Sequence, residues 1–263
     1  MKGVSIDKLL NNRYIKPYGD TFNDGIVQLS FTIPARDKYL AIEAAKVLLS
    51  KMGFKDIKIA TVEEPLENFY FFVVYACTTY EVDMNNITPI VPEYEKMSKD
   101  EIENFVKKYI GKTITIVGAT IGTDSHTVGL DSILNIKGFK GEKGLEAYKV
   151  FKVYNLGPQV MPAELVQKVK DLKAQVILVS QTITQKNMHI RNLTELVDIL
   201  EAEGIRDNVI LICGGSRIDH RLAKELGYDA GFGPGTTPSD VASFIVQFYY
   251  KKILKSSEKK GKN

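Results

Sequence analysis

The 263-residue sequence contains no tryptophan and only two cysteines, Cys77 and Cys213. Both cysteines lie inside apolar, strand-like segments, so we expect buried thiols in a reducing cytoplasm rather than a disulfide framework. No Cys-x-x-Cys pair is present. These absences exclude a disulfide-stapled scaffold and the common cysteine-based metal motif.

The sequence also lacks a long hydrophobic run and a strong excess of either charge. Its longest apolar stretch, residues 69–77, is far shorter than the roughly 20 residues that span a bilayer, and residues 1–10 contain no apolar signal segment. The 35 basic and 32 acidic side chains leave a net charge of +3, which is too small to suggest nucleic acid as a partner. We therefore expect a cytoplasmic protein that binds neither nucleic acid nor a membrane.

The length and pattern of the chain predict two domains. In the first, residues 1–95, the predicted elements are a strand, a helix and two strands, at 26–33, 37–52, 57–62 and 69–79. The helix carries apolar residues on one face: Leu40, Ala44, Val47 and Leu48. Such a small α+β layer buries little apolar surface alone, so its exposed face packs against a partner, a second copy or the second domain of the chain.

In residues 96–263, strands and helices alternate regularly. The predicted strands are 113–118, 150–154, 176–180, 209–213 and 229–232. Helix starts are indicated by a capping box of Ser98 and Glu101, and then by Pro162, Asn192, Asp219 and Pro238. This alternation predicts a doubly wound, parallel five-stranded α/β sheet of the Rossmann-like or flavodoxin-like class.

The most informative motif follows the first strand of this sheet. Asp124, His126 and Gly129 form a D-x-H-x-x-G pattern at a strand end, where open α/β sheets bind ligands. An imidazole nitrogen is a good axial ligand for cobalt, and a nearby carboxylate can accept the other ring N–H and fix the tautomer. The pattern resembles the cobalamin-binding signature of base-off/His-on enzymes, in which a histidine displaces the benzimidazole of the cofactor.

The resemblance implies a deep slot for the displaced benzimidazole tail. Ser180 can hydrogen-bond a benzimidazole nitrogen, and glycines after two further strands would keep side chains out of the slot, although each glycine alone is equally typical of a turn or helix C-cap. The usual S-x-L of the family has Thr182 at its third position. We expect His126 to ligate cobalt and the cofactor to be bound by Thr123, Asp124, Ser125, His126, Thr127, Val128, Gly129, Val179, Ser180, Gln181, Thr182, Gln185, Gly214, Gly215, Ser216, Gly231, Phe232, Gly233, Pro234, Gly235, Thr236 and Thr237.

A nicotinamide dehydrogenase is the first alternative, because it also has parallel strands and a glycine-bearing first loop. Its fingerprint is missing: Gly118 and Gly122 form G-x-x-x-G instead of G-x-G-x-x-G. The second strand is followed by Asn155-Leu156-Gly157 and not by the acidic residue that binds ribose.

Two further segments, residues 136–139 and 179–187, resemble the small-subunit family of lysine 5,6-aminomutase, and the likeness covers essentially the whole chain. The resemblance implies adenosylcobalamin, a pyridoxal 5'-phosphate shared with a large barrel-shaped subunit, association through the N-terminal module and a heterotetramer. It also implies a radical shift of the terminal amino group of D-lysine or β-lysine from C6 to C5. In that family a lysine eleven positions after the ligand histidine forms an aldimine with pyridoxal phosphate, which here is Lys137; the local sequence alone does not separate it from Lys140 or Lys143.

Two related functions are compatible with the same motifs. A corrinoid carrier of a methyltransferase system needs the same histidine and slot, but such carriers usually begin with a helical bundle and have no use for Lys137. An ornithine 4,5-aminomutase subunit differs in substrate length, which this chain does not reveal. His189 and His220 lie in less persuasive contexts than His126, and we expect neither to be a ligand.

Overall fold

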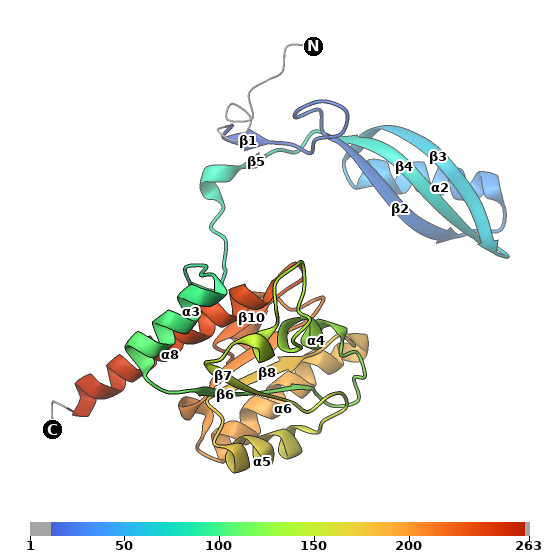
Figure 1. Ribbon diagram of the computed structural model, residues 1–263. Coiled ribbons are helices and arrows are strands. Elements are labelled where there is room, and N and C mark those ends of the chain that lie inside the picture. Colours follow the sequence, from blue (N-terminus) through green and yellow to red (C-terminus); the bar gives the residue numbers. More distant parts are fainter. Residues whose placement is uncertain (1–11, 261–263) are drawn as a thin grey trace. The chain divides into compact units, whose positions relative to one another are not determined.

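The computed structural model describes residues 12–260, with the side chains described as far as residue 252. The chain divides between Pro89 and Ile90 into two compact units, each with its own core (Figure 1). None of the helices in the described part of the chain is both long and apolar enough to cross a membrane.

The first unit is a three-stranded antiparallel sheet with one helix on one of its faces (Figure 1). Its strands lie in the order β2 (Ile26–Pro34), β4 (Phe69–Thr78) and β3 (Phe54–Leu66), and α2 (Lys38–Lys51) connects β2 to β3. The carboxylate of Asp37 caps this helix by accepting a hydrogen bond from the Leu40 amide at 2.9 Å. A short antiparallel pair, β1 (Tyr14–Ile15) and β5 (Val82–Asp83), and a 3-10 turn, Met84–Asn86, complete the unit.

Helix α2 turns a different face to the sheet than the apolar pattern suggested. Ala41, Ala45 and Leu49 are buried against the sheet, where they belong to the same core as Tyr70, Phe72 and Val74 of β4. Leu40, Val47 and Leu48 from the predicted stripe are instead 52%, 52% and 45% exposed. The small Ala41 and Ala45 let the helix lie close to a sheet whose aromatic side chains already fill the layer between them.

The second unit contains a five-stranded, all-parallel sheet, which confirms the predicted fold class. The strand order is β7 (Phe151–Asn155), β6 (Ile114–Thr120), β8 (Val176–Ser180), β9 (Ile210–Gly214) and β10 (Ala230–Phe232). In chain order this is 2-1-3-4-5, the flavodoxin-like arrangement. The chain changes direction across the sheet between the first and third strands, so β6 and β8 flank the expected ligand-binding edge.

Helices cover both faces of this sheet (Figure 1). One core contains side chains from α3 (Lys99–Phe105), α4 (Val128–Leu134) and α8 (Pro238–Lys260). The other contains side chains from α5 (Pro162–Leu172), α6 (Met188–Ala202) and α7 (His220–Glu225). A π-helical turn, Val106–Ile110, extends α3, and 3-10 turns lie at Leu145–Ala147, Gln185–Asn187 and Arg206–Asn208.

Most of the predicted helix starts are confirmed. Ser98 and Glu101 form the capping box of α3, the Asp219 carboxylate accepts from the Leu222 amide at the start of α7, and Pro162 and Pro238 are the first residues of α5 and α8. The prediction that Asn192 caps a helix is wrong. Helix α6 begins at Met188, and Asn192 lies inside it as a buried residue, because its amide has a partner in the neighbouring loop.

Candidate functional site

A cavity of about 420 Å³ opens at the carboxyl ends of β8, β9 and β10, beside α4. Its size lies within the range typical of small-molecule sites. Thirteen of the residues predicted to bind a cofactor line this cavity: Val128, Gly129, Val179, Ser180, Thr182, Gly214, Gly215, Ser216, Phe232, Gly233, Pro234, Gly235 and Thr236. Four segments that are far apart in sequence therefore form one wall.

The sequence reasoning missed part of this wall. The missed lining residues are Leu130, Ser132, Ile133, Phe139, Leu178, Ile212, Cys213 and Val241. Several of them belong to α4, a seven-residue helix in a segment where the sequence indicated no helix start. The helical spacing of Leu130, Ile133 and Leu134 was the available signal, but the helix is too short for a strong periodic pattern.

Asp124 is the polar centre of the edge between β6 and β8. Its carboxylate is 1% exposed and accepts hydrogen bonds from the backbone amides of Thr182 and of Ile183, the latter at 3.0 Å, both in the loop after β8. The same carboxylate accepts from the amide of His126 at 3.0 Å and contacts the His126 ring at Nδ1, 2.7 Å away. One buried side chain thus holds two loops and one imidazole in place.

The ionisation state of Asp124 fixes the chemistry of His126. Burial raises the pKa of Asp124, but the hydrogen bonds from Thr182, His126 and Ile183 outweigh burial and leave the pKa below its ordinary value. An ionised carboxylate only accepts hydrogen bonds, so Nδ1 of His126 carries the proton. The imidazole is 59% exposed, and its Nε2 is the nitrogen left with a lone pair for a metal.

A second buried contact supports the loop that carries Asp124. The Gln181 side chain, 1% exposed, donates to the backbone oxygen of Ile121 and accepts from the Asn192 amide at 3.1 Å. Gly122 has a φ of +67°, and a Cβ there would lie 2.4 Å from the Asn192 side-chain nitrogen. The glycine is therefore required both by its backbone conformation and by the close packing of α6.

The glycines of the site have different physical roles. A Cβ at Gly129 would lie 3.8 Å from the Ser180 hydroxyl oxygen, so a larger side chain there would extend into the cavity. Gly215 is required by packing, because a Cβ would lie 2.0 Å from the Gln181 backbone oxygen. Gly231 is outside the cavity wall, and its Cβ would lie 2.4 Å from the Asp219 backbone oxygen.

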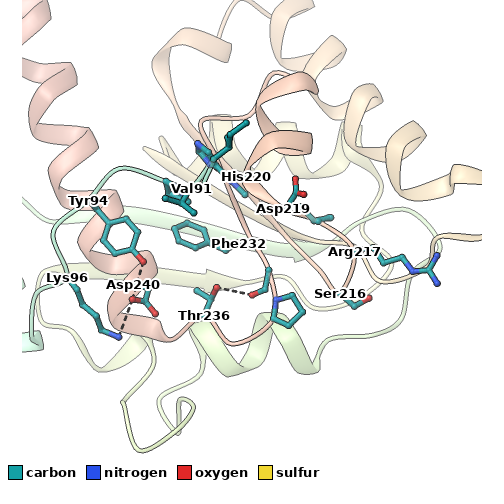
Figure 2. Close-up of a pocket in the computed structure, with 16 residues that line it drawn as sticks. Val91, Tyr94, Lys96, Ser216, Arg217, Asp219, His220, Phe232, Thr236 and Asp240 are labelled. Carbon is teal, nitrogen blue, oxygen red and sulfur yellow. Dashed lines mark hydrogen bonds and ion pairs between the residues drawn. The ribbon is translucent and has the colours of Figure 1, made fainter. Parts of the chain in front are cut away.

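Gly231 lies instead in a neighbouring open pocket (Figure 2), which shares with the cavity Ser216, Phe232, Gly233, Pro234 and Thr236. Here Asp240 accepts from the Tyr94 hydroxyl at 3.1 Å and pairs with Lys96 at 3.1 Å. The His220 ring accepts a hydrogen bond from the Gly231 amide at 3.3 Å. These contacts fix the end of β10 and the start of α8, so His220 has a structural role.

The remaining predicted residues lie around the cavity rather than in its wall. Thr123 and Ser125 are exposed loop residues, and Gln185 is exposed at the start of a 3-10 turn. Thr127 is half-buried at the start of α4, and the buried Gln181 and Asp124 hold the loops through hydrogen bonds. Thr237 is buried at the start of α8, where its hydroxyl donates to Asp240 at 2.7 Å.

Lys137 is exposed in the loop after α4 and does not line the cavity. The loop backbone is well defined by hydrogen bonds: the Lys137 amide donates to the Asn135 side chain at 3.0 Å, and Phe139 and Glu142 exchange backbone bonds at 3.0 Å. Gly138 has a φ of +70°, and a Cβ there would overlap the Glu142 backbone oxygen. The lysine side chain therefore projects from a closed, glycine-dependent turn.

These residues fit a cobalamin bound through histidine. The cavity wall is mostly apolar with the Ser180 hydroxyl in it, as a benzimidazole requires, and Gly129 leaves the space in front of that hydroxyl open. The imidazole that would reach cobalt has its other nitrogen held by a carboxylate.

Comparisons with known proteins agree with this arrangement. A family model described as the B12 binding domain matches residues 114–242, and one described as the dimerisation domain of D-ornithine 4,5-aminomutase matches residues 14–92. The chain is 48% identical to the lysine 5,6-aminomutase beta subunit of Acetoanaerobium sticklandii over 94% of both chains, and 51% identical to that of Fusobacterium nucleatum over 92% of both. It is 30% identical to trimethylamine corrinoid protein 2 of Methanosarcina mazei, over 78% of this chain and 88% of that protein.

Proposed function

Because the chain belongs to the family of lysine 5,6-aminomutase beta subunits, we propose that it binds adenosylcobalamin through His126 in an isomerase that moves the terminal amino group of D-lysine or β-lysine from C6 to C5. The cobalamin-binding role and the isomerase class follow from the family and domain matches. A large, barrel-shaped partner subunit, a heterotetramer and a cytoplasmic location complete the proposal; the two free thiols, Cys77 and Cys213, are consistent with that location.

The observation that carries the proposal is the contact between Asp124 and His126 at the switch point of the sheet. Asp124 orients the imidazole through Nδ1, so that Nε2 would be presented as the donor to cobalt. The cavity between α4 and the ends of β8 and β9 would hold the displaced benzimidazole, and the Ser180 hydroxyl in its wall would donate a hydrogen bond to it. Adenosylcobalamin supplies the radical that removes a substrate hydrogen, and pyridoxal phosphate holds the migrating amine.

The substrate is tested by substrate-dependent cleavage of the cobalt–carbon bond. We expect the chain, purified with its large subunit and loaded with both cofactors, to show loss of the adenosylcobalamin spectrum on addition of D-lysine or β-lysine. Ornithine is the matched control because it differs by one methylene. A response to ornithine alone would contradict the lysine assignment, and a chain that takes up adenosylcobalamin but responds to neither amino acid would contradict the aminomutase assignment.

Lys137 is proposed to hold pyridoxal phosphate covalently when substrate is absent, which would fix the cobalamin-binding unit until a substrate amine releases it. The support is its place eleven residues after His126 and its projection from a closed turn. Borohydride reduction of the loaded complex is expected to leave a pyridoxyl group on Lys137, found by peptide mapping. The label should persist in Lys140→Gln and be lost from this chain in Lys137→Gln; a label on Lys140, on Lys143 or only on the large subunit would refute the assignment.

A corrinoid carrier is the second candidate, favoured by the similarity to the trimethylamine corrinoid protein. The first unit of this chain argues against it, because residues 14–92 match a dimerisation domain and fold as a strand-rich layer. Uptake of pyridoxal phosphate only in the presence of a large subunit would separate the aminomutase from the carrier. An ornithine-type substrate is separated by the cleavage assay above.

A further inference from the structure

Helix α2 has two apolar faces, although a helix on the surface of a small sheet normally has one. The inner face, Ala41, Ala45 and Leu49, is buried on the sheet. The outer face, which we call the outer stripe, is Leu40, Ala44, Val47 and Leu48. Its three large residues are about half exposed, and Tyr39 beside them is 81% exposed. An apolar stripe of this kind indicates an interaction surface.

The opposite side of the unit is the weaker candidate for a contact. On the sheet face away from α2, the central strand places Phe71, Val73 and Tyr75, of which the first two are partly buried and only Tyr75 is exposed. They are paired in register with the polar, exposed Thr32, Ser30 and Gln28 of β2. An antiparallel sheet with polar side chains over one face can remain in water. The outer stripe has no comparable polar cover.

From these observations we propose that the outer stripe of α2 is the contact between two copies of this chain, packed antiparallel about a twofold axis at Ala44. A twofold contact requires a patch that complements itself. Antiparallel packing centred on residue 44 places residue i level with residue 88 − i of the second copy. Leu40 then lies level with Leu48 of the second copy, and the small Ala44 residues meet at the axis, where they permit close approach.

The charges at the two ends of the helix fit the same arrangement. The same relation places Asp37, at the start of α2, level with Lys51 of the second copy, at its end. Both side chains are exposed, so an ion pair forms at each end of the contact. Asp37, Leu40, Ala44, Val47 and Lys51 also follow the alternating three- and four-residue spacing of a helix–helix seam. Antiparallel alignment further opposes the two helix dipoles.

The inference rests on the proposed role of the first unit in subunit association, and the test keeps the two separable. The full chain loaded with adenosylcobalamin is compared with its Leu40→Glu, Leu48→Lys and Tyr75→Glu variants by sedimentation velocity, alone and with the large subunit. Wild type and Tyr75→Glu are expected to be dimers. Either leucine variant is expected to raise the dimer dissociation constant at least about 100-fold, because each substitution occurs twice in the contact.

A mixing experiment tests whether two variants that are monomeric alone form a dimer together, a result that misfolded chains would not give. Leu40→Glu chains mixed with Leu48→Lys chains are expected to form dimers again, since the glutamate of one copy lies level with the lysine of the other. Dissociation by Tyr75→Glu alone, dimers unaffected by both leucine variants, or no recovery on mixing would overturn the inference. The inference would also be overturned if the wild-type chain sedimented as a single copy in every sample. A leucine variant that stayed dimeric but no longer bound the large subunit would overturn it as well. Normal dimers without cobalamin uptake would count against the proposed function and leave the contact standing.

Discussion

Replacing His126 with alanine is expected to abolish histidine ligation of cobalt and to lower turnover of the assembled enzyme at least about 100-fold, since even the outer partners of metal ligands contribute 10–100-fold. The structural reason is that Asp124 holds Nδ1 of this imidazole at 2.7 Å and leaves Nε2 as the donor. The measurement is the electron paramagnetic resonance spectrum of the cobalt(II) state, in which an axial nitrogen splits the lines. Labelling the wild-type chain with ¹⁵N-histidine should change that splitting.

Two variants control for indirect effects of the histidine substitution. Asp124→Asn keeps the size of the side chain but removes its charge, so the splitting should remain while affinity for the cofactor falls by roughly 10–100-fold. His220→Ala removes a ring whose partner is the Gly231 amide, and it should leave the spectrum unaltered. A wild-type spectrum that is insensitive to ¹⁵N-histidine would show that the cofactor keeps its own nucleotide on cobalt.

Filling the cavity from Gly129 is expected to separate binding of the nucleotide tail from binding of the corrin. Gly129→Leu should weaken adenosylcobalamin binding by roughly 10- to 100-fold, the cost of forcing extra methylenes into an occupied slot. Binding of cobinamide, the same corrin without the nucleotide tail, should be unchanged. The physical reason is the 3.8 Å between a Cβ at position 129 and the Ser180 hydroxyl, which places the added side chain in the slot.

Gly129→Ala adds a side chain of intermediate size between those of wild type and Gly129→Leu. The residue lies in α4 with an ordinary helical backbone, so alanine should raise the free energy of unfolding of the chain without cofactor by up to about 1 kcal/mol. Its affinity for adenosylcobalamin should lie between those of wild type and Gly129→Leu. Titration calorimetry and urea unfolding measure the two effects. Equal losses for cobalamin and cobinamide would contradict a tail slot at this position.

The sequence alone determined the parallel α/β unit, the strand ends and the histidine motif. Buried parallel strands such as β8 (Val176–Ser180) are nearly continuous apolar runs, and the helices between them begin at strong local signals such as Pro162 and Asp219. The motif Asp124-x-His126 is also local, because the carboxylate accepts from a ring and an amide only two residues away. These features need no knowledge of distant residues.

The tertiary structure decided which surfaces are covered and which loops meet. Helix α2 has two apolar stripes, and only packing on the sheet selects Ala41 and Ala45 over Leu40 and Leu48 as the buried side. The links from Thr182 to Asp124 and from Gln181 to Ile121 depend on the order of strands, which places residues about 60 positions apart at one edge. Helical periodicity describes one segment at a time, whereas burial and buried hydrogen bonds depend on neighbours that only the folded chain supplies.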